Sequence, residues 1–343
     1  MNRFLRVFAG GLLAAALLAG CAFSGLFGRK QHTATYLDLF DTVTTLVGYA
    51  PVEADFLEEA GIVYDTLRYY HQLFDIYRDY PGINNLKTVN DLAGVSAVEV
   101  DPAIIRLLQD CRHYCEITEG RVDVTMGSVL QLWHEARSEG LSDPATARLP
   151  DPEALKEAAA HTGFDRIVID EEAGTVFITD PETSLDVGAI AKGWAVEQAA
   201  QSAPEGILIS VGGNVSATGP KPDGAAWVIG IQHPEGGGNY LHTVSLTRGT
   251  AVTSGDYQRT YTVGGKAYHH IIDPDTGMPA ELWRSVTVVG TDSGLADALS
   301  TALFLLPMDA GKALAEALDV EVLWVDTRGE THMTPGFQAL ILS

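Results

Sequence analysis

Apolar residues recur at the three- to four-residue spacing of an amphipathic helix along much of the first half of the chain. This spacing predicts helices over 53–78, 101–120, 122–136 and 151–163. The second helix has clear boundaries, because the Asp-Pro pair at its start suits a first helical turn and the glycine at its end suits a stop. Residues 79–94 are rich in asparagine, glycine and proline, so a loop is expected there.

Alternating polar and apolar residues predict strands in much of the remainder. Strands or hairpins are expected over 33–50, 166–179, 226–234, 240–255 and 259–273, with a buried strand running into glycines over 206–219. Strand and helix are expected together over 184–203 and 285–306, and the chain is expected to finish as a helix and strands over 313–343. Hairpins combined with crossover helices predict an α+β fold with mixed or antiparallel sheets. No shift in composition marks a linker, so residues 36–343 are expected to form one globular domain.

The amino terminus has the pattern of a secretory signal peptide. Arg3 and Arg6 precede an apolar stretch that is too short for a comfortable membrane span, and small residues then lead to Cys21. Small residues before a single cysteine resemble the cleavage site of bacterial lipoproteins, in which the cysteine is acylated. We therefore expect a signal peptide at 1–20, a lipid anchor at Cys21 with a tether over 21–35, and an extracytoplasmic protein held at the membrane. An ordinary signal peptide with an incidental cysteine is the alternative.

Charge excludes one class of partner. The chain carries 45 acidic and 22 basic residues, giving a formal net charge of -23. Nucleic acid needs a basic face, so we expect no nucleic-acid partner and no polybasic membrane patch.

Cys111 and Cys115 lie four residues apart in a predicted helix and are interpreted as small core residues. A disulfide between them is the alternative outside the cytoplasm, whereas zinc would need further ligands nearby.

Two glycine-containing segments suit close approach to a phosphate. DVGAIAKG places a turn before a predicted helix, where backbone N–H groups and Lys192 favour an anion; a tight turn with a solvated lysine is the alternative. SVGGNVSATG contains Gly212 and Gly213, which permit unusual backbone conformations, and Asn214, which can donate and accept hydrogen bonds. Taken alone, this second segment favours a β-bulge over a phosphate-binding turn.

Candidates for anion binding and proton transfer follow in the third quarter of the chain. TSGDYQR offers the hydroxyl of Ser254 and the guanidinium of Arg259, although an ordinary polar turn has the same composition. In AYHHIIDPDTGMP, His269 and His270 would face opposite sides of a strand that leads to Asp273, so a two-histidine metal site is not expected. One histidine as a general base is the functional interpretation, and two partly buried structural histidines are the alternative.

Asp297 and Thr301 lie four residues apart on a predicted helix and therefore on one face of it. Both offer hard oxygen atoms, which suit Mg²⁺, and a hydrogen bond between the two side chains is the alternative. Phosphate-binding turns, a pair of hard ligands and one base together predict Mg²⁺-assisted chemistry on a phosphate or pyrophosphate.

Five motifs, in chain order, are LDVGAIAKGWAVE, ISVGGNVSATG, TSGDYQRTY, YHHIIDPDTGMP and ADALSTALF. In this order they resemble the ApbE family, the FAD:protein FMN transferases, and the resemblance extends from about Phe40 to the carboxyl terminus. It implies Mg²⁺-dependent transfer of the FMN part of FAD to a Thr or Ser hydroxyl of an acceptor protein, with a phosphoester formed and AMP released. The implied acceptors are subunits of membrane redox pumps and related FMN-binding domains. The family contains many lipoproteins, in agreement with Cys21.

The resemblance also implies roles for individual residues. Three would supply Mg²⁺ ligands: Asp297, Thr301 and the backbone carbonyl of Ala189. His270 would be the base and Asp273 would help to orient the site. Those expected along the FAD pocket are Asn90, Lys192, Gly212, Gly213, Asn214, Ser254 and Arg259. The chain departs from the family at FDTVTT, Phe40–Thr45, where many members have a Met-Gly-Thr-like stretch.

Two other functions use the same residues. A hydrolase would let water replace the acceptor hydroxyl and release FMN and AMP from FAD. A flavin-binding lipoprotein would hold the cofactor without turnover, which the presence of His270, Asp297 and Thr301 argues against.

Overall fold

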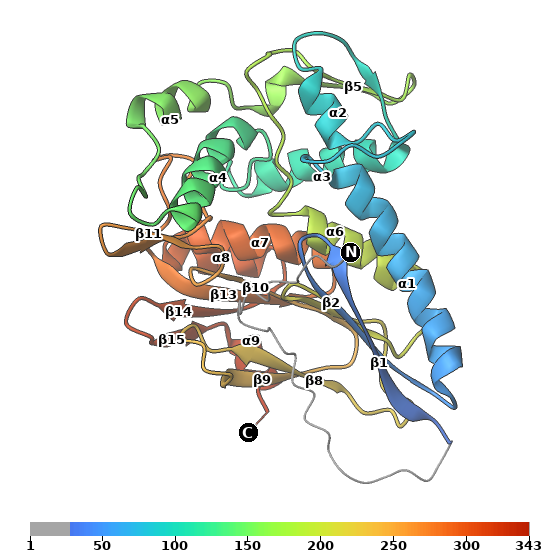
Figure 1. The fold of residues 1–343 in the computed structure, drawn as a ribbon. Helices are drawn as coiled ribbons and strands as arrows, with labels where there is room; N and C mark the ends of the chain where they lie inside the picture. The colour runs from blue at the N-terminus through green and yellow to red at the C-terminus, as the bar shows by residue number, and fades with distance from the viewer. Residues whose placement is uncertain (1–27, 343) are drawn as a thin grey trace, which may run out of the picture.

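An antiparallel sheet of eight strands forms the centre of the structure (Figure 1). The computed structural model describes residues 28–342. Across the sheet the strands are ordered β1-β2-β6-β7-β10-β13-β14-β15, and every neighbouring pair is antiparallel. Their bounds are β1 Lys30–Leu39, β2 Thr42–Ala50, β6 Leu208–Val211, β7 Asn214–Ala217, β10 Gly249–Gly255, β13 Trp283–Gly290, β14 Glu321–Asp326 and β15 Thr331–Met333. Helices packed on this sheet confirm the predicted α+β fold.

Four helices cover one face of the sheet: α1 Glu53–Phe74, α6 Ala191–Ser202, α7 Ser293–Leu305 and α8 Met308–Ala317. Helix α7 is the most enclosed, with 11 of its 13 residues buried. An apolar helix that is buried on every side belongs in the interior of a protein. Here the sheet lies on one side of α7 and a second layer of helices on the other (Figure 1).

The opposite face of the sheet is covered by a hairpin and one short helix: β8 Trp227–Gln232, β9 Tyr240–Leu246 and α9 Pro335–Leu340. Residues along β8 alternate between buried and half-buried, as expected for a strand with one face against a core. Trp227 and Phe337 are fully buried in this part of the core.

A layer of helices and short strands lies above α6 and α7 (Figure 1). Its members are α2 Leu86–Asp91, β3 Val98–Glu99, α3 Pro102–Ile117, α4 Gly127–Ser142, α5 Pro152–Ala159, η1 Phe164–Arg166, β4 Ile167–Asp170 and β5 Thr175–Ile178. The hairpin of β11 Tyr261–Val263 and β12 Lys266–Tyr268 packs against α4. The candidate residues lie where this layer meets α6 and α7.

The hydrophobic pattern predicted most elements, and five details differ. Residues 79–94 contain helix α2, whose first turn is capped by the side chain of Asn85. Residues 206–219 form the β6–β7 hairpin and not one strand. Strand β12 ends at Tyr268, so the strand expected through Asp273 is wrong. Residues 335–340 are helical. Strand β1 begins at Lys30, inside the stretch expected to be a tether.

The anchor itself lies outside the described residues, as do Cys21 and the predicted signal peptide at 1–20. Between residues 28 and 342, no helix is both long enough and apolar enough to cross a membrane. Cys111 is buried in the core, as predicted, and Cys115 is half-buried, and the two thiols are not joined.

Candidate active site

The turn that enters α6 is held in place from the helical layer. Asn90 on α2 donates from Nδ2 to the Leu185 carbonyl (2.9 Å) and accepts the Leu185 N–H on Oδ1 (2.8 Å). Asp186 then accepts the N–H of Gly188 on Oδ1 (2.8 Å), which closes the turn. The NH₂ group and the oxygen of the Asn90 amide are thus both hydrogen-bonded to the backbone of Leu185, so Asn90 holds the turn in position.

The contact between Gly193 and Asp297 joins α6 to α7. The Gly193 N–H donates to Asp297 Oδ2 at 2.8 Å. In a continuous helix that N–H would bond to the carbonyl four residues earlier, which belongs to Ala189. Within the described chain the Ala189 carbonyl receives no backbone hydrogen bond, so it is free for another partner. A Cβ atom on residue 193 would lie 2.2 Å from the Ser293 carbonyl oxygen and 2.4 Å from Asp297 Cβ, so only glycine permits this approach.

The atoms around this contact suit Mg²⁺. The Asp297 side chain is buried, with 5% of it exposed, and Oδ1 is not used by Gly193. Thr301 lies one turn further along the same face of α7, and its hydroxyl makes no hydrogen bond to any residue between 28 and 342. A carboxylate, a hydroxyl and a free carbonyl are the hard oxygen donors that Mg²⁺ takes, so the chemistry of these residues fits the Mg²⁺ that the sequence resemblance implies.

Lys192 is directed towards the same carboxylate. Its ammonium donates to the Gly188 carbonyl at 2.9 Å and lies 3.6 Å from Asp297 Oδ2, with 21% of the side chain exposed. The solvated lysine considered from the sequence is therefore wrong. A positive charge beside Asp297 partly offsets the cost of burying the carboxylate.

Ser254 fixes α7 on the sheet. Its hydroxyl lies 2.8 Å from the hydroxyl of Ser300, which in turn donates to the Asp297 carbonyl at 2.9 Å. Ser254 thus acts on the position of Asp297 through one intermediate residue.

The β6–β7 turn places two unpaired polar groups next to each other. Gly212 and Gly213 have φ angles of 56° and 106°, so they form a two-residue turn of the I′ type instead of a bulge. Asn214 and Thr44 are both in register with Val211, from the two sides of β6, and so lie on one face of the sheet. Among the described residues, neither Asn214 Nδ2 nor Thr44 Oγ1 has a hydrogen-bond partner, although both are buried. Buried groups without partners commonly mark a ligand site. Thr44 was not predicted.

The two adjacent histidines have different surroundings. His269 donates from Nε2 to the Ala280 carbonyl (2.8 Å) and accepts the Ile271 N–H on Nδ1 (3.2 Å). Both ring nitrogens are therefore used by the backbone, and His269 is structural.

His270 has a free nitrogen. Its Nδ1 is buried and has no partner within the described part of the chain. Burial lowers the pKa of His270 to about 3, and the positive charges of Arg259, His269 and Lys192 act in the same direction. The imidazole is therefore neutral at physiological pH and able to accept a proton.

Asp273 organises the loop that follows His270. Its carboxylate accepts the Asp275 N–H (2.9 Å) and lies 3.6 Å from the Arg121 guanidinium. Trp133 on α4 donates to the Gly277 carbonyl in the same loop (2.9 Å). These contacts fix the shape of the loop, and the orienting role of Asp273 towards the site stays a prediction.

A narrow pocket beside His270 contains residues that sequence reasoning missed. Arg259 lines it, and so do His134 and Arg137 from α4. The Tyr77 hydroxyl lies 2.9 Å from His134 Nδ1, with the two rings stacked at 6.0 Å. In the sequence, His134 and Arg137 look like the solvated face of a helix, so no local pattern could have singled them out.

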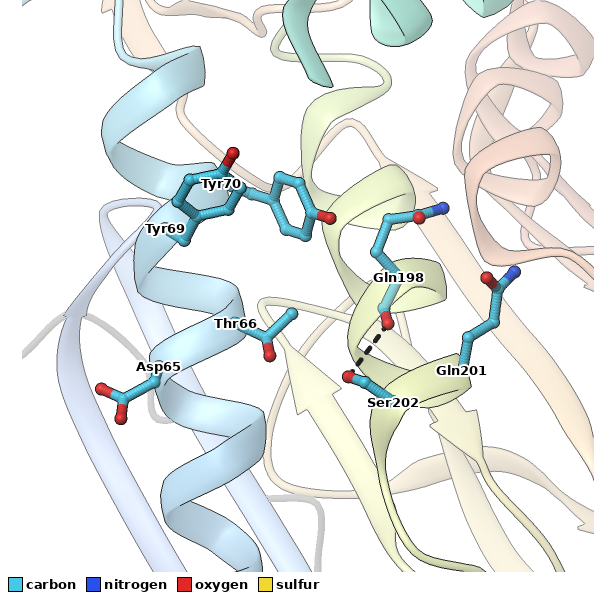
Figure 2. A pocket seen from close by; sticks show the side chains of 7 residues that line it. All are labelled: Asp65, Thr66, Tyr69, Tyr70, Gln198, Gln201 and Ser202. Carbon is cyan, nitrogen blue, oxygen red and sulfur yellow. Dashed lines mark hydrogen bonds between the residues drawn. The ribbon is translucent and has the colours of Figure 1, made fainter. Parts of the chain in front are cut away.

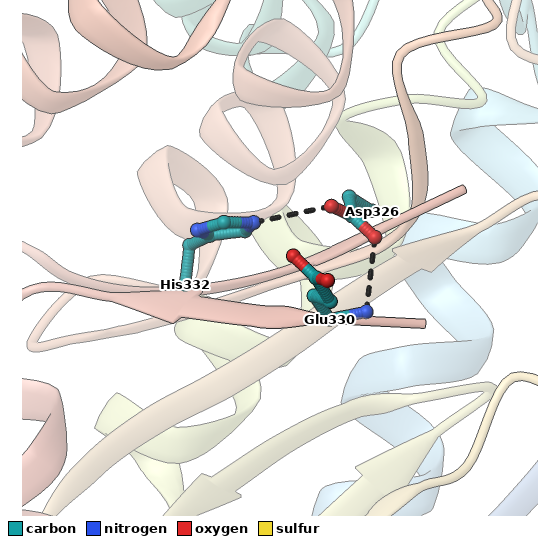
Figure 3. Close-up of side chains that lie close together, drawn as sticks. All are labelled: Asp326, Glu330 and His332. Atoms are coloured by element: carbon teal, nitrogen blue, oxygen red, sulfur yellow. Dashed lines mark hydrogen bonds and ion pairs between the residues drawn. The ribbon is translucent and has the colours of Figure 1, made fainter. Parts of the chain in front are cut away.

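Two other features lie away from this site. An open depression between α1 and α6 is lined by hydroxyl and amide side chains and by Asp65 (Figure 2). Asp326, Glu330 and His332 gather at the β14–β15 turn (Figure 3). There the Arg328 guanidinium forms ion pairs with Asp326 at 3.1 Å and with Glu330 at 2.9 Å, so a side chain of the protein already neutralises these carboxylates.

Comparisons with known proteins agree with this arrangement. The ApbE family model matches residues 40–324, and the chain belongs to the ApbE family. It is 34% identical over 250 residues to the FAD:protein FMN transferase of Treponema pallidum, covering 67% of each chain. It is 32% identical over 237 residues to the enzyme of the same name from Haemophilus influenzae, covering 66% of each. The solved ApbE protein of Thermotoga maritima has a TM-score of 0.79 at 28% identity, over 92% of this chain and 100% of that one.

Replacing Gly193 tests the contact between the two helices. Gly193→Ala should lower the free energy of unfolding by about 1–3 kcal/mol, because the new methyl group meets backbone atoms. It should also reduce the rise in melting temperature that Mg²⁺ produces, since Asp297 is displaced. Melting curves with Mg²⁺ and with chelator measure both effects. Gly61→Ala is the control, because nothing lies within 4 Å of a Cβ there; equal melting behaviour of the two variants would contradict the assignment.

Acidification tests the burial of His270. Its pKa in the folded chain, about 3, lies below the ordinary 6.5, so between these values the unfolded chain binds a proton that the folded chain does not. The free energy of unfolding should therefore fall as the pH falls from 7 towards 4, with up to about 1.4 kcal/mol per pH unit from this residue. Urea unfolding at pH 7 and pH 5 gives the difference in the free energy of unfolding between the two pH values. This difference should be smaller in His270→Asn than in the parent chain, and it should be the same as in the parent chain for the exposed His113→Asn. If the free energy of unfolding depended on pH in the same way in His270→Asn and in the parent chain, the ring would not be held neutral in the folded protein.

Proposed function

We propose that this protein is an FAD:protein FMN transferase, which moves the FMN part of FAD onto a Thr or Ser hydroxyl of an acceptor protein. The observation that carries the proposal is the Gly193–Asp297 contact, which leaves a free carbonyl at Ala189 beside a buried carboxylate. The unpaired nitrogen of His270 adds a base to this set of ligands. The names of the relatives from Treponema pallidum and Haemophilus influenzae support the same activity.

Asp297, Thr301 and the Ala189 carbonyl would hold Mg²⁺. The bound ion supplies charge neutralisation on the pyrophosphate of FAD and makes its phosphorus more electrophilic. Lys192, which lies 3.6 Å from Asp297 Oδ2, would add a second positive charge near the same phosphates. The unpaired Asn214 and Thr44 offer hydrogen bonds to the nucleotide on the sheet side of the site.

His270 accepts the proton of the acceptor hydroxyl. The hydroxyl oxygen forms a bond to the phosphorus of the FMN phosphate, the bond from that phosphorus to the bridging oxygen breaks, and AMP leaves with this oxygen. Burial and, to a smaller extent, the neighbouring cations hold the pKa of the free imidazole low. An anionic substrate beside these cations would raise the pKa and make the ring a stronger base. No nucleophilic side chain of the enzyme is needed for this reaction.

We further propose that the protein works outside the cytoplasm, attached to the membrane through an acylated Cys21. The support is the sequence alone: a short apolar stretch, small residues and then a single cysteine. A membrane site also suits the acceptors that the family resemblance implies, which include subunits of membrane redox pumps.

Transfer to an acceptor protein tests the proposed function. The full chain, FAD, Mg²⁺ and a small flavin-accepting domain should give a fluorescent acceptor band on a denaturing gel. His270→Asn should lower the rate by about 10²–10⁴ through loss of the base, and Asp297→Asn should weaken the response to Mg²⁺. The exposed His113→Asn and Asp309→Asn are matched controls and should keep the parent rate. Release of free FMN and AMP without a labelled acceptor would identify a hydrolase, and FAD binding without AMP would identify a flavin carrier.

A further inference from the structure

The candidate base, His270, belongs to neither a helix nor a strand, so other contacts must fix its position. Strand β12 ends at Tyr268, and the following strand, β13, begins only at Trp283. A side chain on an irregular segment is placed precisely only where neighbouring groups hold the backbone. Here the residue that precedes the base provides these contacts.

The imidazole of His269 holds the backbone on both sides of His270. Its Nδ1 accepts the N–H of Ile271 at 3.2 Å, so this hydrogen bond spans the base. The side chain of Asn makes the same contact, from residue i to the N–H of residue i+2, in an Asx turn, where it fixes the local backbone. The direction in which the His270 side chain points therefore depends on the ring of His269.

The second nitrogen of the His269 ring closes the loop that follows the base. Nε2 donates to the Ala280 carbonyl at 2.8 Å. The Ala280 N–H in turn donates to the Ile271 carbonyl at 3.0 Å, and Ile272 forms a bridge with Pro279. One ring thus holds together the two ends of the loop.

His269 also connects this loop to α7, the helix that carries Asp297 and Thr301. The ring of His269 meets the ring of Phe304 edge-on, with centroids 5.6 Å apart and planes at 76°. Phe304 is fully buried and lies three residues after Thr301 on the same helix. Ile271 is buried in the same part of the core. The base and the candidate metal ligands are therefore linked through one buried imidazole.

Only a neutral imidazole at position 269 can make all of these contacts. The ring must donate from Nε2 and accept at Nδ1, which requires a single ring proton. Burial lowers the pKa of His269, so the neutral form is kept at physiological pH. Asn could keep the bond to the Ile271 N–H, whereas Phe could keep only the contact with Phe304. These two substitutions therefore separate the hydrogen bond across the base from the packing on α7.

We propose that His269 is a positioning residue, which orients His270 and holds it in place relative to Asp297 and Thr301 during FMN transfer. This inference rests on the proposed function for the role of His270 as the base, although the orientation of the ring does not require turnover. A displaced base lowers the rate steeply, since a shift of about 1 Å can cost about 10²-fold.

Proton NMR of the His270 ring tests the orientation without FAD, Mg²⁺ or an acceptor. The ring signals of His270 are identified by their loss in His270→Asn. A ring released from its buried place should titrate closer to the ordinary pKa of His, so His269→Phe should raise the pKa of His270 by about one unit or more above its value in His269→Asn. Both variants remove the charge of residue 269, so the difference between them reports the hydrogen bond. Equal values in the two variants would overturn the inference.

Transfer kinetics test whether His269 acts through His270. His269→Phe should lower kcat by about 10²-fold and leave the KM for FAD close to the parent value. In the His270→Asn background the same substitution should lower kcat no further, because no base remains to be positioned. His242→Phe, at a half-buried histidine on β9, is the matched control and should keep the parent kcat. A full second loss of kcat in the double variant would contradict a role that passes through His270.

The two measurements distinguish this inference from the proposed function. If the pKa of His270 rises in His269→Phe as expected but the parent chain only hydrolyses FAD, the positioning role stands and the transferase function fails. If His269→Phe transfers FMN at the parent rate, the transferase function stands and the positioning role fails.

Discussion

The hydrogen bond from Gly193 to Asp297 is the interaction on which the arrangement of the site depends. It joins residues 104 positions apart, and it replaces the bond that would otherwise occupy the Ala189 carbonyl. The same contact sets how closely α6 approaches α7, because any side chain at position 193 would meet backbone atoms of α7. Thus one missing Cβ determines both the packing of two helices and the oxygen atoms available to a metal.

Charge in this molecule is distributed very unevenly. The chain as a whole is strongly acidic, with a net charge of -23, yet three cationic side chains, Lys192, Arg137 and Arg259, gather around His270. A local positive region inside an acidic protein attracts anionic substrates while the remaining surface repels them. Burial is the main cause of the low pKa of His270, and the cations that attract the substrate act in the same direction, since they also disfavour a proton on the ring.

The sequence predicted the helices and strands better than the tertiary contacts between them. Long helices and hairpins were found because their apolar spacing is local, whereas α2 was missed because its signal is only a capped turn at Asn85. Family motifs pointed to Asp297 and His270, but not to the way Gly193 frees a carbonyl. No local pattern marks His134 and Arg137, because the pocket that they line is completed by residues more than a hundred positions further along the chain. Tertiary packing alone creates these contacts.

The enclosure of α7 has a consequence for motion. Hydrogen exchange of a helix that is buried on every side requires large-scale opening, so the amides around Asp297 should belong to the slowest-exchanging unit of the protein. Arg259, by contrast, is exposed in a loop, where local fluctuations need no disruption of the core. The two sides of the site thus differ in the timescale of their motion: the buried helix that would hold the metal is rigid, whereas the exposed loop that carries Arg259 can move locally.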